Sequence, residues 1–251
     1  MELGCYVAAL CGGIAAVPLL LIRARKLGDP ENFMVIRPVG MFFSSWLDVQ
    51  IEVKGKEYLD DAAGPCIIIS NHQSFMDIVG FMMVAPRRCV PVAKKSLLYS
   101  PFGLALWLSG TVFIRRYRPS SARATVEEIS CKIKKQNMKL WMFPEGTRNY
   151  YLDNELLPFK KGAFYLALGA GIPLIPVVFS SHRPFYSVPE KKFDTGGRVI
   201  AQILPPIFPR EAAAGDAINV EDVDQLAQEL RDLMTKTFHT VTQEAMVKYY
   251  S

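Results

Sequence analysis

The sequence lacks the cysteine patterns that bind zinc or build a disulfide framework. Its five cysteines are scattered, odd in number and without CxxC or Cys/His spacing, so we expect reduced thiols and no metal site. Helix-turn-helix, zinc-finger and RNA-binding signatures are also missing, so a net charge of +5 does not indicate a nucleic acid partner. This charge suits an anionic membrane or a phosphate-bearing substrate instead.

No Ser/Gly-rich stretch, acidic stretch or internal repeat divides the 251 residues. This length suits one α/β domain. The mean hydropathy of +0.15 is too low for a chain made mostly of membrane spans, so the apolar excess must be local. We therefore predict an N-terminal membrane-anchoring helical segment over residues 1–47 and one folded domain over residues 48–251.

The first apolar run, Leu3 to Ile22, contains no charged residue. It has the length of a spanning helix, which needs about 20 apolar residues. Arg23, Arg25 and Lys26 follow it and favour a cytosolic position for the domain that comes next. A cleaved signal peptide or a buried core helix is the alternative, but the basic n-region of a signal peptide is missing.

A second apolar stretch, Phe33 to Leu47, is interrupted by Arg37 and Pro38. It is also too short for another full span. We predict an interfacial helix that places apolar side chains among lipid headgroups and acyl chains; these are Met41, Phe42, Phe43 and Trp46. A helix packed on the domain is an equally good interpretation.

Beyond residue 47, apolar strand-like runs alternate with helical patterns, which predicts an α/β fold with a mostly parallel mixed sheet flanked by helices. The predicted strands are 48–53, 66–70, 89–93, 112–114, 139–143, 174–179 and 198–204. The predicted helices are 75–84, 101–109, 120–136 and 162–170, followed by 220–245. The last of these carries apolar residues at helical spacing and should cover one face of the sheet.

His72 and Asp77 follow the predicted strand 66–70 in the run NHQSFMD, at the edge where ligands bind in open α/β sheets. Five residues within one ideal helix are about 140° apart in rotation, so the two side chains can meet only if His72 precedes the helix and Asp77 lies in its first turns. Asp77 would then fix the tautomer of His72, which could remove a proton from a substrate hydroxyl. A His and an Asp at this spacing also occur often by chance.

Ser74 lies within the same run and could belong to a Ser-His-Asp hydrolase. Such an enzyme usually presents its nucleophile on an elbow of the GxSxG type, which this chain lacks. We therefore interpret Ser74 as a helix N-cap. The pattern favours transfer to a substrate alcohol over hydrolysis through a serine nucleophile.

Two further predicted strands lead into motifs with basic side chains, FPEGTR at Phe143–Arg148 and GTVFIRR at Gly110–Arg116. Arg148 and Arg116 could each grip a phosphate, and Gly146 would let the backbone approach it. Taken singly, the first motif also fits a Pro-Gly turn with a local Glu-Arg ion pair, and the second fits a solvated basic loop. Three strand ends that together supply a base and two arginines favour one common site.

These motifs resemble those of the glycerolipid acyltransferase family and, within it, of the 1-acylglycerol-3-phosphate acyltransferases. The blocks of that family occur in order: HxxxxD at 72–77, GxxFIxR at 110–116, FPEGTR at 143–148 and a Pro-centred block, IPLIPVVFSS, at 172–181. The pieces VPVAKKSLL and LPFKKGAF match as well, and the resemblance covers about 49–206. Jointly these patterns are specific, because independent motifs in the right order rarely coincide.

The resemblance implies acyl transfer from acyl-CoA, a co-substrate, to the sn-2 hydroxyl of lysophosphatidic acid, giving phosphatidic acid and CoA without a metal or cofactor. It implies that His72 is the general base and Asp77 its orienting partner. The acceptor phosphate is assigned to Arg116, Glu145, Gly146, Thr147 and Arg148, with Lys94 adding charge; Asn71 and Pro176 are assigned to the acyl-CoA or acceptor pocket. Arg115 departs from the pattern, since relatives often carry an acidic residue there. The resemblance also implies the endoplasmic reticulum membrane, with the catalytic domain facing the cytosol.

Two classes of alternative remain open. An acyltransferase for glycerol-3-phosphate or another lysophospholipid would keep the same blocks. A non-catalytic membrane protein that binds phosphatidic acid would keep the basic strand ends. The unbroken matches KLWMFPEGTRN and LPFKKGAF favour lysophosphatidic acid.

Overall fold

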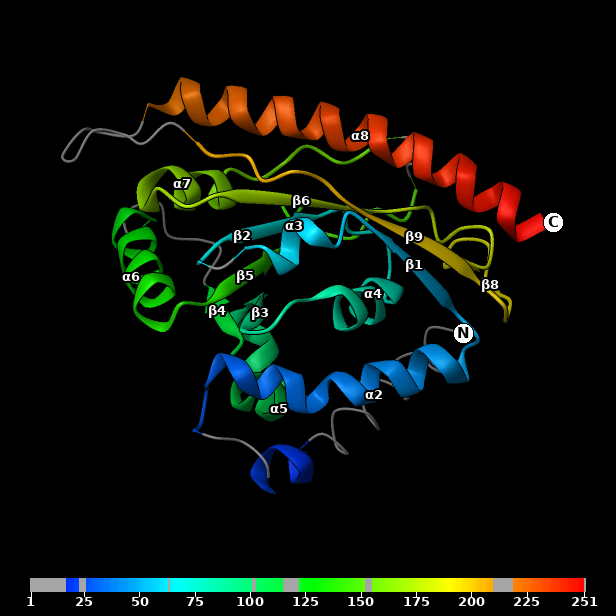
Figure 1. Ribbon diagram of the computed structural model, residues 1–251, viewed down its shortest axis with the longest axis horizontal. Coiled ribbons are helices and arrows are strands. Elements are labelled where there is room, and N and C mark those ends of the chain that lie inside the picture. Colours follow the sequence, from blue (N-terminus) through cyan, green and yellow to red (C-terminus); the bar gives the residue numbers. More distant parts are fainter. Residues whose placement is uncertain are drawn as a thin grey trace.

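The computed structural model describes residues 17–22, 26–62, 64–100, 103–114, 122–151, 155–209 and 219–250. Within these ranges a seven-stranded sheet lies between two layers of helices (Figure 1). Its strands are β1 (Gln50–Lys54), β2 (Ile67–Ser70), β3 (Cys89–Lys94), β4 (Val112–Ile114), β5 (Lys139–Met142), β6 (Leu174–Phe179) and β9 (Arg198–Ile203). All seven predicted strands are confirmed, with small shifts at their ends.

The strand order is β1-β9-β6-β2-β5-β3-β4. Neighbouring strands run parallel except β6 and β9, which are antiparallel. The predicted mostly parallel mixed sheet is therefore confirmed. A short hairpin of β7 (Tyr186–Ser187) and β8 (Lys192–Phe193) was not predicted, because strands of two residues leave no readable alternation.

The helices divide between the two faces of the sheet. They are η1 (Pro30–Asn32), α2 (Phe33–Trp46), α3 (Glu57–Asp60), α4 (Met76–Val84), η2 (Lys95–Tyr99), α5 (Gly103–Leu108), α6 (Ala122–Gln136), α7 (Gly162–Ala170) and α8 (Val220–Tyr250). Figure 1 shows α8 and α7 above the sheet, and α4 with α2 below it. The C-terminal helix covers one face as predicted, and it contacts β6, β9 and α7.

Strand β2 shows how the core is divided. Ile67 and Ile69 pack in the cluster that α6, α7 and α8 cover, whereas Ile68 packs in the cluster between the sheet and helices α2 and α4. All three are fully buried, because successive side chains of a strand point to opposite faces and both faces are covered. A strand that is covered on both faces has an unbroken apolar sequence, and CIIIS has this pattern.

Helix α2 both packs on the domain and presents an apolar outer side. Phe33 and Ile36 are buried, and the backbone at Gly40 approaches α4 so closely that a Cβ there would lie 2.5 Å from Met82. The outer side carries exposed Met41, Phe42 and Trp46. The buried side makes α2 part of the fold, as the packed-helix interpretation predicts. The interfacial role of the exposed side stays a prediction.

Most of the predicted membrane segment 3–22 lies outside the described residues, and so do Arg23 and Arg25. Residues 17–22 are helical, with Leu20 buried and Leu21 and Ile22 exposed. In the part of the chain that the structure describes, no helix is both long and apolar enough to cross a bilayer.

Pro176 lies inside β6, where a missing N–H group would ordinarily cost a ladder bond. Its carbonyl accepts the Leu204 N–H at 2.9 Å, so its nitrogen faces the same side, toward β9. The antiparallel ladder to β9 begins only at the next residue, Val177. The proline therefore removes no hydrogen bond from the parallel pairing with β2. Pro176 is buried in the sheet, which differs from the pocket position assigned to it.

Candidate active site

The carboxyl ends of three adjacent strands, β6, β2 and β5, bring three of the predicted motifs to one edge of the sheet. The β2–α4 connection carries His72, the loop after β5 carries FPEGTR, and the segment after β6 carries Ser180 to His182. In open α/β sheets this edge is where ligands bind. The topology therefore brings together motifs that are separated by up to about a hundred residues of sequence.

His72 and Asp77 meet as the spacing required. Helix α4 begins at Met76, so Asp77 lies in its first turn and His72 in the turn before it. The carboxylate oxygen Oδ2 of Asp77 lies 2.8 Å from Nδ1 of His72 and also accepts the backbone N–H groups of Gln73 (2.7 Å) and Ser74 (2.8 Å). Because a carboxylate can only accept, the neutral imidazole carries its proton on Nδ1, and Nε2 keeps a free lone pair.

Glu145 fixes the backbone of His72. One carboxylate oxygen accepts the His72 N–H at 2.6 Å, and the other accepts the Leu157 N–H at 2.9 Å. The His72 carbonyl accepts the Asn149 N–H at 2.7 Å, and the imidazole stacks on Phe143 with ring centres 4.1 Å apart. Burial raises the pKa of Glu145 to about 7, against the lowering effect of the two backbone hydrogen bonds. Glu145 thus orients the loop of the histidine.

Ser74 contacts a second histidine rather than His72. Its Oγ accepts the Met76 N–H at 3.0 Å and lies 2.9 Å from Nδ1 of His182. The N-cap position is Phe75, so the N-cap prediction for Ser74 was one residue early, although its hydroxyl does bind a helix N–H. The Asp77 carboxylate approaches that same Nδ1 at 3.7 Å. A hydrolase triad needs opposite nitrogens of one imidazole, so these residues do not form one.

His182 is a buried residue that the sequence did not single out. Burial lowers the pKa of its imidazole, against the opposite effect of Asp77. Its backbone N–H donates to the Gln73 side chain at 3.2 Å, so it helps to fix the turn that carries His72. The sequence could not indicate a role for His182, because it lies 110 positions after His72 and only the pairing of β6 with β2 brings it to the site.

The FPEGTR loop places its remaining predicted residues near the same edge. Gly146 has φ +71°, and a Cβ there would lie 3.2 Å from the Lys160 side chain, so glycine is the residue that fits this turn. Arg148 donates from Nη1 to the Tyr150 hydroxyl at 2.9 Å, and Thr147 is exposed. These positions leave the loop open toward solvent beside the histidine.

Two predicted basic residues come from the neighbouring strands. Lys94 ends β3 and is exposed. Arg116, together with Arg115, lies outside the described residues, and β4 ends at Ile114, two positions earlier. Because β5, β3 and β4 are consecutive in the sheet, their carboxyl ends point to the same edge.

Asn71 has a different use from the pocket position assigned to it. Its Nδ2 donates to the Phe179 carbonyl and its Oδ1 accepts the Phe179 N–H, both at 2.9 Å. The side chain is fully buried and joins the end of β2 to the end of β6. The structure therefore shows the Asn71 amide joining two strands of the sheet.

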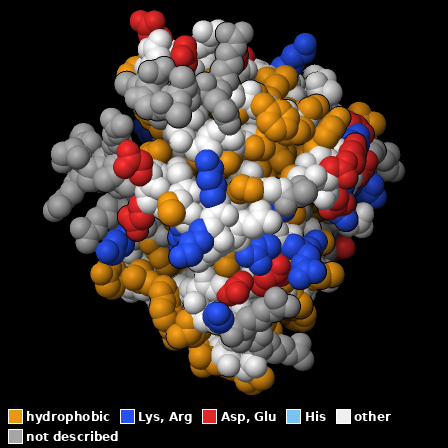
Figure 2. Space-filling view, turned by 60° about the vertical axis from the view of Figure 1, so that its left-hand side comes forward, with side chains coloured by type: hydrophobic (Ala, Val, Ile, Leu, Met, Phe, Trp, Pro, Cys, Tyr) orange, Lys and Arg blue, Asp and Glu red, His pale blue; other side chains and the backbone are white. Residues whose placement is uncertain are grey.

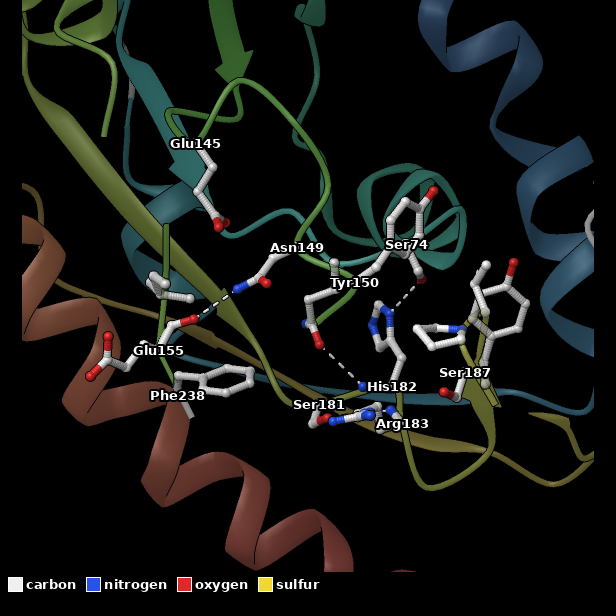
Figure 3. A pocket seen from close by; sticks show the side chains of 15 residues that line it. Ser74, Glu145, Asn149, Tyr150, Glu155, Ser181, His182, Arg183, Ser187 and Phe238 are labelled. Atoms are coloured by element: carbon white, nitrogen blue, oxygen red, sulfur yellow. Dashed lines mark hydrogen bonds between the residues drawn. The ribbon is translucent and has the colours of Figure 1, made fainter. Parts of the chain in front are cut away.

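A cavity opens beside the histidine turn, toward α8 (Figure 3). It lies between the turn, the loop after β5 and the segment after β6, and Phe238 of α8 forms part of its wall. Polar side chains line it; these include Gln73, Asn149, Tyr150, His182 and Arg183. Over the described ranges, no three His, Cys, Asp or Glu side chains gather in a way that could hold a metal ion.

Comparison with known proteins identifies the family. The family model named Acyltransferase matches residues 50–180. The mouse 1-acyl-sn-glycerol-3-phosphate acyltransferase alpha is 36% identical over 93% of this chain and 78% of its own length, and the human beta protein is 41% identical over 92% and 80%. The yeast 1-acyl-sn-glycerol-3-phosphate acyltransferase is 38% identical over 92% of this chain and 72% of its own length.

The fold agrees with a solved structure. The crystal structure of the 1-acyl-sn-glycerophosphate (LPA) acyltransferase PlsC from Thermotoga maritima superposes with a TM-score of 0.68 over 94% of this chain and 93% of that one, at 23% identity. The family predicted from the sequence motifs is confirmed by the relatives, and the α/β fold by the structure. The chain is therefore an acyltransferase and belongs to the 1-acyl-sn-glycerol-3-phosphate acyltransferase family.

Proposed function

We propose that this enzyme transfers an acyl group from acyl-CoA to the sn-2 hydroxyl of 1-acyl-sn-glycerol 3-phosphate, giving phosphatidic acid and CoA. The observation that carries the proposal is the 2.8 Å contact between Asp77 and Nδ1 of His72, which leaves Nε2 as a proton acceptor. The names of the relatives support the choice of acceptor. Acyl-CoA is the donor that the family resemblance implies.

In the proposed reaction, Nε2 of His72 takes the hydroxyl proton as the oxygen attacks the thioester carbonyl. Asp77 stabilises the imidazolium that forms. Attack forms the C–O bond and gives a tetrahedral intermediate. When this intermediate collapses, the C–S bond breaks, and the imidazolium gives its proton to the CoA thiolate. A thiol of ordinary pKa, about 8.5, leaves without strong acid assistance.

The developing oxyanion needs a donor, and the turn itself has few to offer. The N–H groups of His72, Gln73 and Ser74 already bind Glu145 or Asp77. Because these N–H groups are already used, we infer that an arginine, Arg148 or Arg116, stabilises the oxyanion. The acceptor phosphate would then lie against the same basic strand ends, with Gly146, Thr147 and Lys94 beside it.

An acceptor panel tests the substrate. Purified full-length enzyme is given oleoyl-CoA with lysophosphatidic acid, glycerol-3-phosphate or lysophosphatidylcholine, and CoA release is measured. We expect lysophosphatidic acid to be preferred by about tenfold or more in kcat/KM, because the other acceptors lack either the acyl chain or the free phosphate monoester. Faster turnover of either competitor would contradict the acceptor assignment, and no turnover of any acceptor would favour a non-catalytic lipid-binding protein.

We also propose that the enzyme works at a membrane surface, by resemblance that of the endoplasmic reticulum with the catalytic domain facing the cytosol. Exposed large apolar side chains occur on α2, on α5 and in the described segments that precede α2; these are Leu21, Ile22, Leu27, Met41, Phe42, Trp46, Leu104 and Trp107. Figure 1 shows α2 and α5 at the bottom of the molecule, and Figure 2 shows hydrophobic side chains gathered along this edge with Lys and Arg side chains above them. An apolar edge beneath basic groups suits an anionic lipid interface.

The double variant Phe42→Ser/Trp46→Ser tests this membrane contact. The two side chains are 65% and 63% exposed, so their loss should leave the fold intact while vesicle binding weakens by roughly tenfold or more, given about 25 cal/mol per Å² of apolar surface. Cosedimentation with anionic vesicles measures the change. Phe208→Ser, which removes a 73% exposed phenyl group before α8, is the matched control. Equal binding by both variants would contradict the assignment of this edge.

Deleting residues 1–47 would be a less specific test of membrane attachment. It would remove α2, whose Phe33 and Ile36 are buried against the domain. The core would then be exposed at the same time as the lipid-facing side chains are lost. The point substitutions avoid this difficulty.

A further inference from the structure

One peptide group connects the C-terminal helix to the turn that carries His72. Arg231, on α8, donates to the Leu156 carbonyl from Nε (2.9 Å) and from Nη2 (2.6 Å). The N–H of that same peptide group, which belongs to Leu157, donates to Glu145. Glu145 in turn accepts the His72 N–H. Hydrogen bonds therefore run without a break from α8 to the backbone of the proposed base.

The segment that contains this peptide is also held from the other side. Asn149 donates its side-chain amide to the Glu155 carbonyl at 2.8 Å, and its backbone N–H binds the His72 carbonyl at 2.7 Å. Figure 3 shows the bond between Asn149 and Glu155 above α8. Leu156 is 2% exposed. The position of residues 155–157 is thus coupled to both backbone groups of His72.

Several titratable groups lie around Glu145. Asp77 of α4 and Arg231 of α8 act on its carboxylate through their charges, and His72 donates its backbone N–H to it. Tyr150 and Glu155 from its own loop and His182 from the segment after β6 line the same cavity. Burial is the largest influence and raises the pKa of Glu145, and the Asp77 charge raises it as well. The Arg231 charge lowers it. A guanidinium bound to the carbonyl also polarises the peptide, which makes its N–H a stronger donor toward the carboxylate.

We propose that Arg231 is a positioning residue for His72: by holding the 156–157 peptide, it keeps the Glu145 carboxylate bound to the His72 amide. The proposal rests on the proposed function only in that His72 acts in turnover. Ionised Glu145 accepts both N–H groups. Protonated Glu145 has a hydroxyl in place of one acceptor, and the His72 turn loses part of its support.

The direction of the pH effect follows from these contacts. Because the pKa of Glu145 is raised to about 7, the wild-type enzyme should lose activity as the pH falls through this region. Removing the Arg231 charge raises the pKa of Glu145 further, so the acid limb of the kcat profile should move to higher pH.

The experiment compares pH profiles of kcat for full-length wild type, Arg231→Gln and Arg231→Lys in lipid–detergent micelles, with oleoyl-CoA and lysophosphatidic acid. For Arg231→Gln we expect the acid limb to shift to higher pH, and kcat at neutral pH to fall by about tenfold because the His72 turn is held less firmly. KM should stay unchanged, because Arg231 does not contact the proposed acceptor site, and Arg231→Lys should restore part of the profile. In a Glu145→Gln background, Arg231→Gln should cause no further shift.

Glu244→Gln is the matched control. It breaks a different ion pair of α8, in which Lys54 of β1 donates to Glu244 at 2.6 Å, and it leaves the Leu156 carbonyl untouched. Its profile should match wild type. If Arg231→Gln loses kcat without a shift of the acid limb, or if Glu244→Gln shows the same shift, Arg231 only fastens α8 and the proposal is overturned.

Hydrogen–deuterium exchange gives a readout that needs no substrate. The amides of Leu157 and His72 should exchange faster in Arg231→Gln than in wild type or Glu244→Gln; unchanged exchange would overturn the proposal. If wild type does not turn over lysophosphatidic acid at all, the proposed function fails while the exchange result still decides the role of Arg231.

Discussion

His72→Ala is expected to lower kcat for CoA release by roughly a thousandfold, within the range that general base catalysis contributes. The variant removes Nε2, the only ring nitrogen that Asp77 leaves free, while Asp77 keeps its bonds to the backbone of residues 73 and 74. The fold should survive, because the side chain is 18% exposed and one hydrogen bond contributes only about 1 kcal/mol. The measurement is thiol release from oleoyl-CoA with lysophosphatidic acid as acceptor.

The control for this variant is His239→Ala, which removes an exposed histidine of α8 and should leave kcat unchanged. Vesicle binding should match wild type in both variants, and the loss of one hydrogen bond in His72→Ala should lower Tm by only about 2–4 °C. If His72→Ala retained a rate within about tenfold of wild type, His72 would not be the base.

Asp77→Asn is expected to lower kcat by about a thousandfold or more, as loss of the carboxylate does in other histidine-dependent acyl transfer. The amide is nearly isosteric but neutral, so it cannot stabilise the imidazolium and no longer dictates that Nδ1 carries the proton. Three donors converge on the Asp77 oxygen, so stability should fall as well, by about 1–3 kcal/mol. KM for both substrates should change little. Steady-state kinetics beside thermal unfolding separate the two effects.

Ser74→Ala is the matched control within the same turn. It removes the hydroxyl that binds the Met76 N–H and His182, which should cost about 1 kcal/mol of stability but leave kcat within a few-fold of wild type. In a serine hydrolase with Ser74 as nucleophile, Ser74→Ala would be as damaging as Asp77→Asn. Equal loss in both variants would therefore contradict the transferase mechanism.

The strands and the histidine geometry could be predicted from the sequence because local rules decide them. Ile67, Ile68 and Ile69 form a short run of β-branched residues that favours a strand covered on both faces. The five-residue spacing of His72 and Asp77 allows one arrangement at a helix start. Helix α8 was predicted from its apolar spacing, although it runs to Tyr250, five residues past the predicted end. In each case the information lies within a few residues of sequence.

The supporting contacts of the site could not be predicted, because they join residues that only the sheet order brings together. The Asn71 side chain donates to the carbonyl of Phe179, 108 positions away, and Arg231 donates to a carbonyl 75 positions away. Glu145 was assigned to the acceptor phosphate as part of FPEGTR, whereas the structure shows its carboxylate occupied by two backbone N–H groups. A motif names the residues of a site without saying which ones hold the others.

The central claim, acyl transfer to the sn-2 hydroxyl of lysophosphatidic acid with His72 as base, is tested most directly by positional analysis of the product. Wild type and His72→Ala are incubated with isotope-labelled oleoyl-CoA and 1-acyl lysophosphatidic acid, and the phosphatidic acid is cleaved with an sn-2-specific phospholipase. We predict that wild type forms phosphatidic acid with the label released entirely from sn-2, and that His72→Ala forms almost none. Label retained at another position, or equal product from both proteins, would contradict the claim.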